Sequence, residues 1–147
     1  MDIAAIPFHR LLGIRVARLG EDGMLVLDDT PALHNHLDTV HASAQYALAE
    51  ACSGALLADR FPDLAAGVLP VVRRAEVKYR RPARGTLTAR ASLIPGSEAR
   101  VRDDLAAKGR TLVDVAAEVV DAGQTVVLSA TLHWFLQRVE DGPALSH

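Results

Sequence analysis

The sequence is short of cysteine, of excess charge and of long apolar runs. Cys52 is the only cysteine among the 147 residues, so no disulfide can form within the chain, and a reducing, cytoplasmic location is expected. The net charge of -2 gives no basic field of the kind that attracts nucleic acid or anionic lipid. The longest weakly polar stretch, residues 39–58, still contains His41 and Glu50, which makes it a poor membrane span. We therefore expect no nucleic-acid partner and no membrane partner.

The amino terminus also lacks the features of a targeting segment. Asp2 stands where a signal peptide carries positive charge, and Pro7 interrupts the apolar run. Apolar residues make up 50% of the chain and charged residues 23%, as in ordinary globular proteins. A chain of this length can bury roughly 68–70% of its unfolded surface. We expect one domain over residues 1–147, with a frayed tail after residue 139.

Hydrophobic periodicity predicts one long helix among several strands. Residues 40–59 place apolar side chains on most faces of a helix, as in a buried helix, and Asp38 or Thr39 could cap it. The other predicted elements are a short helix at 3–12, a hairpin at 13–19 and 24–28, a surface helix at 97–109, and strands at 71–81, 86–93, 112–120 and 125–136. This order indicates an α+β fold in which an antiparallel β-sheet wraps around one long central α-helix, and a second subunit covers what stays exposed.

Glu50 is the first candidate for chemistry. It is the only formally charged side chain between Asp38 and Asp59, and it falls in the middle of the apolar helix. A carboxylate there is costly unless it is paired, hydrogen-bonded or protonated, so we expect its pKa to be raised. The alternative is a narrow polar stripe, shared with Ser43 and Ser53, that faces water or a structural partner.

The start of the same helix is the second candidate. Free backbone N–H groups around Ala42 and Ser43, together with the helix dipole, suit a carbonyl oxygen that gains negative charge. Asn35 and His41 flank this point, and either could orient a water or polarise a carbonyl. The alternative is an ordinary capped helix, with Asn35 in a turn and His41 without a task.

A metal site is a competing interpretation of the same segment. His34, His36 and Asp38 match the His-x-His-x-Asp core of metallo-β-lactamase-like hydrolases, where they would bind zinc. Those enzymes continue with a histidine directly after the aspartate, whereas Thr39 follows here, and the chain is short for that fold. We expect no metal.

Basic side chains gather in residues 73–90, where Glu76 is the only acid. The cluster could hold the phosphates of a nucleotide-bearing substrate, and a solvated outer face of the sheet is the alternative. It consists of Arg73, Arg74, Lys78, Arg80, Arg81, Arg84 and Arg90.

Cys52 is expected to pack in the core rather than to act as a nucleophile, because it is a small thiol in an alanine-rich helix.

Two segments together resemble a known family. Residues 35–50, Asn-His-Leu-Asp-Thr-Val-His-Ala-Ser-Ala-Gln-Tyr-Ala-Leu-Ala-Glu, resemble the signature of hotdog-fold acyl-CoA thioesterases of the phenylacetate-degradation (PaaI-like) type. That signature is Asn-x-x-Gly-x-x-His-Gly-Gly followed by Leu-Ala-Asp or Leu-Ala-Glu. Residues 77–89 are similar to the strand pair that this family carries after its helix, and the similarity spans residues 10–137.

The resemblance implies hydrolysis of an acyl-CoA thioester by a homodimer or a dimer of dimers, with active sites at the subunit interface and CoA lying across it. By position, Glu50 would be the nucleophile or general base, and the Ala42 N–H would form the oxyanion hole. Asn35 would hold the carbonyl or water, beside His41. Substrate contacts are expected from Ser43, Asp38, Ser53, Arg80 and Arg81. CoA belongs to the substrate, so no cofactor is implied.

The chain departs from the signature at three glycines and at one strand position. Asp38 replaces the first glycine, and Ala42 and Ser43 replace the pair, which tightens the site near the helix start and adds a charge. Val72 stands where some members carry serine or threonine. A non-catalytic hotdog domain that binds an acyl-CoA or related ligand is therefore the alternative function. A hotdog dehydratase or hydratase would need a histidine context that this sequence lacks.

Overall fold

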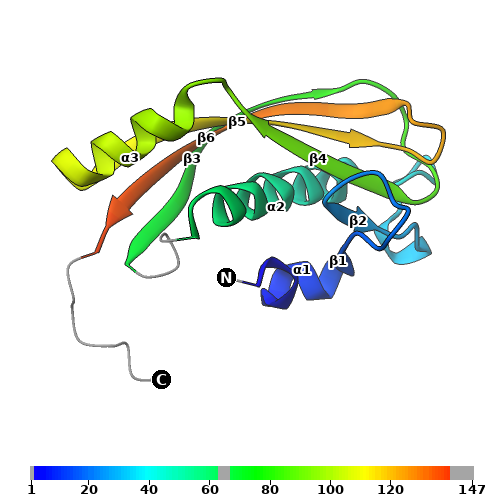
Figure 1. Cartoon of the computed structure of the whole chain (residues 1–147). Helices are drawn as coiled ribbons and strands as arrows, with labels where there is room; N and C mark the ends of the chain where they lie inside the picture. Colours follow the sequence, from blue (N-terminus) through cyan, green and yellow to red (C-terminus); the bar gives the residue numbers. More distant parts are fainter. Residues whose placement is uncertain (1, 63–66, 140–147) are drawn as a thin grey trace.

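Six antiparallel strands form one sheet that curls around a long helix (Figure 1). The structure is a computed structural model and describes residues 2–62 and 67–139. The strands are β1 (Ile14–Val16), β2 (Leu25–Leu27), β3 (Val68–Tyr79), β4 (Leu87–Leu93), β5 (Arg110–Val120) and β6 (Val126–Arg138), in the order β1-β2-β4-β5-β6-β3. The helix is α2 (Ala42–Arg60), and it lies along the inner face of the sheet. The predicted α+β hotdog arrangement is confirmed.

The helix α2 is buried because its small side chains let the sheet approach closely. Ala47, Ala49, Ala51 and Cys52 are between 0% and 4% exposed. Burial raises the pKa of the Cys52 thiol to about 12, so the group stays protonated and packs as an apolar side chain, as predicted. None of the described helices is both long and apolar enough to span a bilayer.

The strands β5 and β6 alternate buried and outward side chains, as their sequence predicts. Val113 and Leu132 are fully buried against α2 and its surroundings. Asp114 and His133 point to the outer face, where His133 Nδ1 lies 2.7 Å from the Asp114 carboxylate. The predicted surface helix is α3 (Ser97–Lys108), which ends at Gly109 in the left-handed conformation that glycine favours.

The strand β3 forms the long edge of the sheet. It pairs with β6 along one side, and no strand of the described chain pairs with its other side. Leu69, Val71 and Tyr79 on this strand are 54%, 44% and 50% exposed. A long edge with exposed apolar side chains is a surface on which another strand can pair.

The structure differs from the predictions in the local elements near the amino terminus. The predicted first helix is divided into η1 (Ile3–Ala5) and α1 (Pro7–Leu12), because Pro7 has no N–H to continue a helix and begins a new one instead. The hairpin strands β1 and β2 are shorter than predicted, and a turn of 3₁₀-helix, η2 (Pro31–Leu33), lies in the loop before α2. The cap of α2 is His41, and not Asp38 or Thr39. The predicted tail after residue 139 lies outside the described residues.

Candidate functional site

A cavity of about 700 Å³ opens between the N-terminal helices, the second half of α2 and the first half of β3. This volume falls in the range of small-molecule sites, about 300–1,000 Å³. Apolar side chains such as Ile3, Leu57 and Val72 form most of the wall. Within the described chain, His9 and Glu50 are the only titratable side chains that line it. The cavity therefore suits an apolar ligand group, and the part of its wall that can take part in a reaction is the part formed by His9 and Glu50.

Glu50 lies half-buried in this wall. Within the described chain its carboxylate has no hydrogen-bond partner, and His9 lines the same wall. Burial raises the pKa of Glu50 above its ordinary value, and His9 partly opposes that rise. A carboxylate with a raised pKa is a better base near neutral pH, which suits general-base chemistry.

The start of α2 offers one backbone donor without an acceptor. His41 Nδ1 accepts a hydrogen bond from the Ser43 N–H at 2.9 Å, and the His41 carbonyl accepts from Ala44 and Gln45. The Ala42 N–H has no acceptor among residues 2–62 and 67–139. A hollow of about 260 Å³, lined in part by His41 and Ser43, lies at this end of α2. His41 and Ser43 thus shape the helix start, and the Ala42 N–H is left to bind a ligand.

The two candidate groups on α2 do not meet within one chain. Ala42 begins the helix and Glu50 lies near its middle. The axial rise between them is about 12 Å, or about two turns. A single carbonyl group cannot contact both groups of the same helix.

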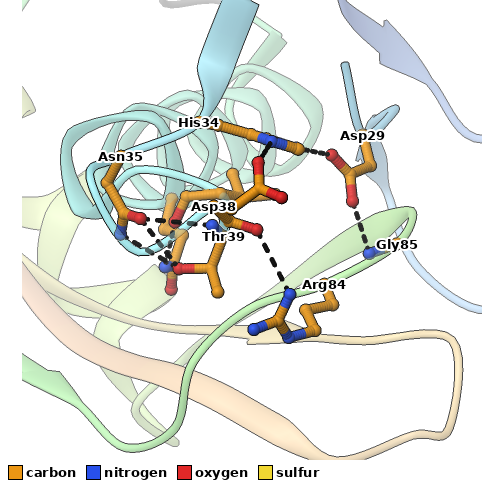
Figure 2. A network of polar contacts seen from close by, with 9 residues as sticks. Asp29, His34, Asn35, Asp38, Thr39, Arg84 and Gly85 are labelled. Atoms are coloured by element: carbon orange, nitrogen blue, oxygen red, sulfur yellow. Dashed lines mark hydrogen bonds and ion pairs between the residues drawn. The ribbon is translucent and has the colours of Figure 1, made fainter. Parts of the chain in front are cut away.

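Asn35 is engaged in the loop before α2 (Figure 2). Its Oδ1 accepts hydrogen bonds from the backbone N–H groups of Leu37 and Thr39, at 2.9 and 3.2 Å, and its Nδ2 donates to Thr39 Oγ1 at 3.0 Å. These bonds fix a tight turn. Asn35 therefore shapes the approach to Ala42, and its amide oxygen is occupied within the loop.

His34 joins two carboxylates in the same loop (Figure 2). Its Nδ1 lies 2.8 Å from Asp38 and its Nε2 bonds to Asp29. Hydrogen bonds to Asp29 and Asp38 raise the pKa of His34 above its ordinary value, and the bond from His34 lowers the pKa of Asp29. Asp29 also accepts the Gly85 N–H at 2.7 Å. In this arrangement neither ring nitrogen of His34 is available to a zinc ion.

Asp38 has a left-handed backbone, with φ of 58°, at the position where the resembled signature has glycine. Aspartate is one of the few side chains that adopt this conformation without large strain. The added charge is paired with His34, and the Asp38 carbonyl accepts a hydrogen bond from Arg84 at 3.2 Å. The departure from glycine is therefore accommodated by the network of Figure 2, and Asp38 holds the loop.

Ser53 lies in the core, so the expected contact with substrate does not fit its position. The side chain is 0% exposed. Its Oγ donates to the Glu50 carbonyl at 2.7 Å and accepts the Trp134 Nε1–H at 3.0 Å. Ser53 thus fixes Trp134, which forms part of the cavity wall.

Arg80 and Arg81 are exposed just beyond the end of β3. The turn that follows them lies beside the start of α2, because the Val40 N–H donates to the Ala83 carbonyl at 2.9 Å. The basic segment and the Ala42 N–H therefore share one end of the molecule.

The sequence patterns give no signal for His9, Asp29 or Trp134. Each reaches its place through tertiary contacts: α1 packs beside α2, and β6 carries Trp134 to the same cavity. A histidine in a short helix and an aspartate in a loop have no local signature that distinguishes them from surface residues.

Comparison with solved structures places the fold among thioesterase-superfamily proteins. A Pseudomonas aeruginosa protein described as a probable thioesterase has a TM-score of 0.79 and 23% identity, covering 93% of this chain and 91% of that chain. The E. coli PaaI protein of the phenylacetic acid degradation operon has a TM-score of 0.59 and 17% identity, covering 92% and 86%. A Bacillus halodurans protein solved with CoA has a TM-score of 0.61 and 21% identity, covering 76% and 69%.

Sequence comparison gives two further findings. No curated protein matches this sequence. The model of a family described as "Domain of unknown function (DUF4442)" matches residues 2–136.

Proposed function

Because the chain belongs to the hotdog-like family described as DUF4442, we propose that it hydrolyses an acyl-CoA thioester to a free acid and CoA. One observation carries the proposal. Glu50 is the only carboxylate of the described chain in the wall of an otherwise apolar cavity, and its pKa is raised. Such a cavity suits an acyl group, and Glu50 is the group that can act on the thioester carbonyl.

Glu50 acts as general base or as nucleophile. In the first route the water oxygen bonds to the carbonyl carbon while its proton passes to Glu50, and the Ala42 N–H holds the resulting oxyanion. The C–S bond then breaks, and the proton returns from Glu50 to sulfur. In the second route Glu50 attacks the carbonyl itself, the C–S bond breaks and CoA leaves as the thiolate. Water then hydrolyses the mixed anhydride to the free acid and the Glu50 carboxylate, and its released proton goes to the thiolate. Turnover in ¹⁸O-water tests for the second route, because label enters the Glu50 side chain only when water attacks the Glu50 carbon of a mixed anhydride.

A second copy of the chain supplies the missing half of each site. Ala42 and Glu50 of one helix are too far apart to share a carbonyl, at about 12 Å along the axis. The open edge of β3 gives two copies a surface on which to pair antiparallel, which brings the two α2 helices together in opposite directions. Ala42 of one copy then serves Glu50 of the other. The homodimer is the minimal form, and a dimer of dimers preserves the same sites.

CoA lies at the basic end of the molecule. Arg80, Arg81 and Arg84 are exposed beside the start of α2, where guanidinium groups can bind its phosphates. The acyl chain then enters the apolar cavity beside Glu50 of the other copy, and CoA stays outside that cavity. The Bacillus halodurans structure with CoA supports a CoA ligand on this fold.

The first test is release of free thiol from short, long and aryl CoA thioesters by the wild type and by Glu50→Gln. The variant should lose about a hundredfold or more in kcat, because general-base catalysis contributes typically 10²–10⁴. Glu118→Gln, an exposed substitution on the outer face of the sheet, is the matched control and should keep the full rate. A wild-type rate in Glu50→Gln would remove Glu50 from the mechanism.

The second test mixes two inactive variants. Ala42→Pro removes the N–H at the first helical position, where proline fits the backbone. If each site combines Ala42 of one copy with Glu50 of the other, a mixed dimer of Ala42→Pro and Glu50→Gln contains one intact site. Mixing after partial unfolding should therefore restore activity. A mixture that stays inactive while forming mixed dimers would show that both groups belong to one chain's site.

Ligand binding without hydrolysis is the second candidate function. It is favoured by Asn35, whose amide oxygen is occupied within the loop and so is not free for a substrate or water. Calorimetric binding of an acyl-CoA, with no thiol released from any member of the panel, would favour this candidate over the thioesterase.

A further inference from the structure

His9 is held in one tautomer by the backbone. It lies on α1 and is 7% exposed, and its Nδ1 is 2.8 Å from the carbonyl oxygen of Ile3. A carbonyl oxygen can only accept a hydrogen bond, so Nδ1 carries a proton and donates it. In the neutral ring the lone pair therefore lies on Nε2.

The second ring nitrogen belongs to the cavity. His9 lines the same wall as Glu50, on the side formed by α1, which lies across α2 from the sheet (Figure 1). Within the described chain Nε2 has no hydrogen-bond partner, yet it is not among the fully enclosed polar atoms that lack one. Nε2 is thus not fully enclosed, and it belongs to a residue that lines the cavity.

Few side chains in the wall of this cavity can form a hydrogen bond with a water. A buried water is retained when it has about two to four polar partners. The wall described here offers two free polar side chains, Glu50 and His9, since the Trp134 N–H is donated to Ser53. Among the side chains of the described chain that line the wall, His9 is therefore the one that can be the second partner of a water that Glu50 deprotonates.

We infer that His9 positions the hydrolytic water: Nε2 accepts one hydrogen bond from the water whose other proton passes to Glu50. With both protons directed to these acceptors, a lone pair of the water oxygen faces the thioester carbonyl carbon. The proton taken by Glu50 later goes to the departing sulfur, so His9 ends each cycle as it began. The inference rests on the general-base route of the proposed hydrolysis, and His9 is a positioning residue for it.

Two substitutions separate this role from a purely structural one. His9→Asn places an amide nitrogen where Nδ1 stands, so it keeps the bond to the Ile3 carbonyl and removes the Nε2 group. His9→Gln extends a polar group toward the place of Nε2 and loses the bond to Ile3. His133→Asn makes the same change on the outer face of the sheet, where His133 Nδ1 also has a fixed acceptor, and serves as control.

The experiment measures kcat, KM and Tm for the wild type and the three variants. His9→Asn should keep the wild-type Tm and KM and lose about tenfold or more in kcat, because misplacement of a reacting group costs up to about a hundredfold. His9→Gln should have the lower Tm and keep more of kcat, and His133→Asn should keep kcat.

Wild-type kcat in His9→Asn would overturn the inference and leave the thioesterase standing. So would a greater loss of kcat in His9→Gln, in step with its Tm, since that is the pattern of a structural role. Absence of hydrolysis by the wild type across the whole thioester panel would overturn the proposed function, and the inference with it.

Discussion

The two halves of α2 present opposite kinds of surroundings. At its start, the polar groups of the loop are satisfied by one another: His34 by Asp29 and Asp38, and Asn35 by the backbone. Near its middle, Glu50 stands in an apolar wall, and His9 is the one other titratable side chain of the described chain that lines this wall. Satisfied polar groups fix a shape, whereas unsatisfied ones are available to substrate and water. The loop before α2 is therefore built for position, and the middle of α2 for chemistry.

The strongest way to break this contrast is to neutralise Glu50. Glu50→Gln should lower kcat by about a hundredfold or more and should also raise Tm, because burial disfavours the charged form that the substitution removes. A lower kcat together with a higher Tm is expected only at a site where the native residue lowers stability and raises activity. Thermal unfolding and thiol release on the same preparation check this, and a fall in Tm would show that the carboxylate has a structural partner.

The next test concerns the hydrogen bond that fixes the cavity wall. Ser53→Ala leaves the buried Trp134 N–H without its acceptor and should cost about 1–3 kcal/mol of unfolding free energy. Trp134→Phe removes the donor as well, so the double variant should lose less than the sum of the two single variants. Urea denaturation of all three gives the coupling, and strict additivity would mean that this bond does not contribute.

A smaller effect is expected at the left-handed residue of the loop. Asp38→Gly and Asp38→Ala both remove the carboxylate that pairs with His34, and they differ in the backbone conformation at φ of 58°. Alanine should be less stable than glycine there by about 1–2 kcal/mol. Equal urea midpoints for the two variants would show that the loop relaxes to a different conformation.

The smallest effect is a pH dependence of the loop network. The pKa of His34 is raised above 6.5, so its contribution to stability is fully present below that value and is lost as the pH rises through the raised pKa. The pKa of Asp29 is lowered below 3.8, so its contribution is present above that value and is lost in acid. The difference in Tm between the wild type and His34→Asn should therefore be largest between these limits and decline at higher pH.

The Tm difference between the wild type and His34→Asn reports on His34 alone, although the pKa of a second histidine is also raised. Bonds to Asp114 and Glu76 raise the pKa of His133 on the outer face of the sheet, and His133 is present in both proteins of the pair. A Tm difference that does not change between neutral and alkaline pH would show that His34 stabilises the loop through its shape and not through its charge.

The sequence predicts the parts of this molecule that depend on periodicity. The apolar pattern of residues 40–59 predicts α2, and the isolation of Glu50 in that pattern predicts the raised pKa that the structure has. The β-branched-rich segments 112–120 and 125–136, which flank a turn, predict the hairpin of β5 and β6. These features are local, because a helix or strand repeats its environment at a fixed spacing.

The parts that the sequence does not predict depend on contacts between distant segments. His41 caps α2 in place of Asp38 or Thr39, because the loop turns at Asn35 and brings the His41 ring over the Ser43 N–H. The pairing of Asp29 with His34 and Gly85, and the meeting of His9 with Glu50, exist only once the sheet has closed around the helix. Whether Ala42 serves Glu50 across two copies stays a prediction.

The fluorescence of Trp134 can report on the cavity. Trp134 is its only tryptophan, it lies in the wall of the Glu50 cavity, and its ring packs against Gly54 of α2. The indole emission of the unlabelled protein therefore comes from one place, and its colour follows the polarity there. An acyl group that enters the cavity displaces water beside the ring and shifts the emission to shorter wavelength, so fluorescence follows occupancy of the site independently of turnover.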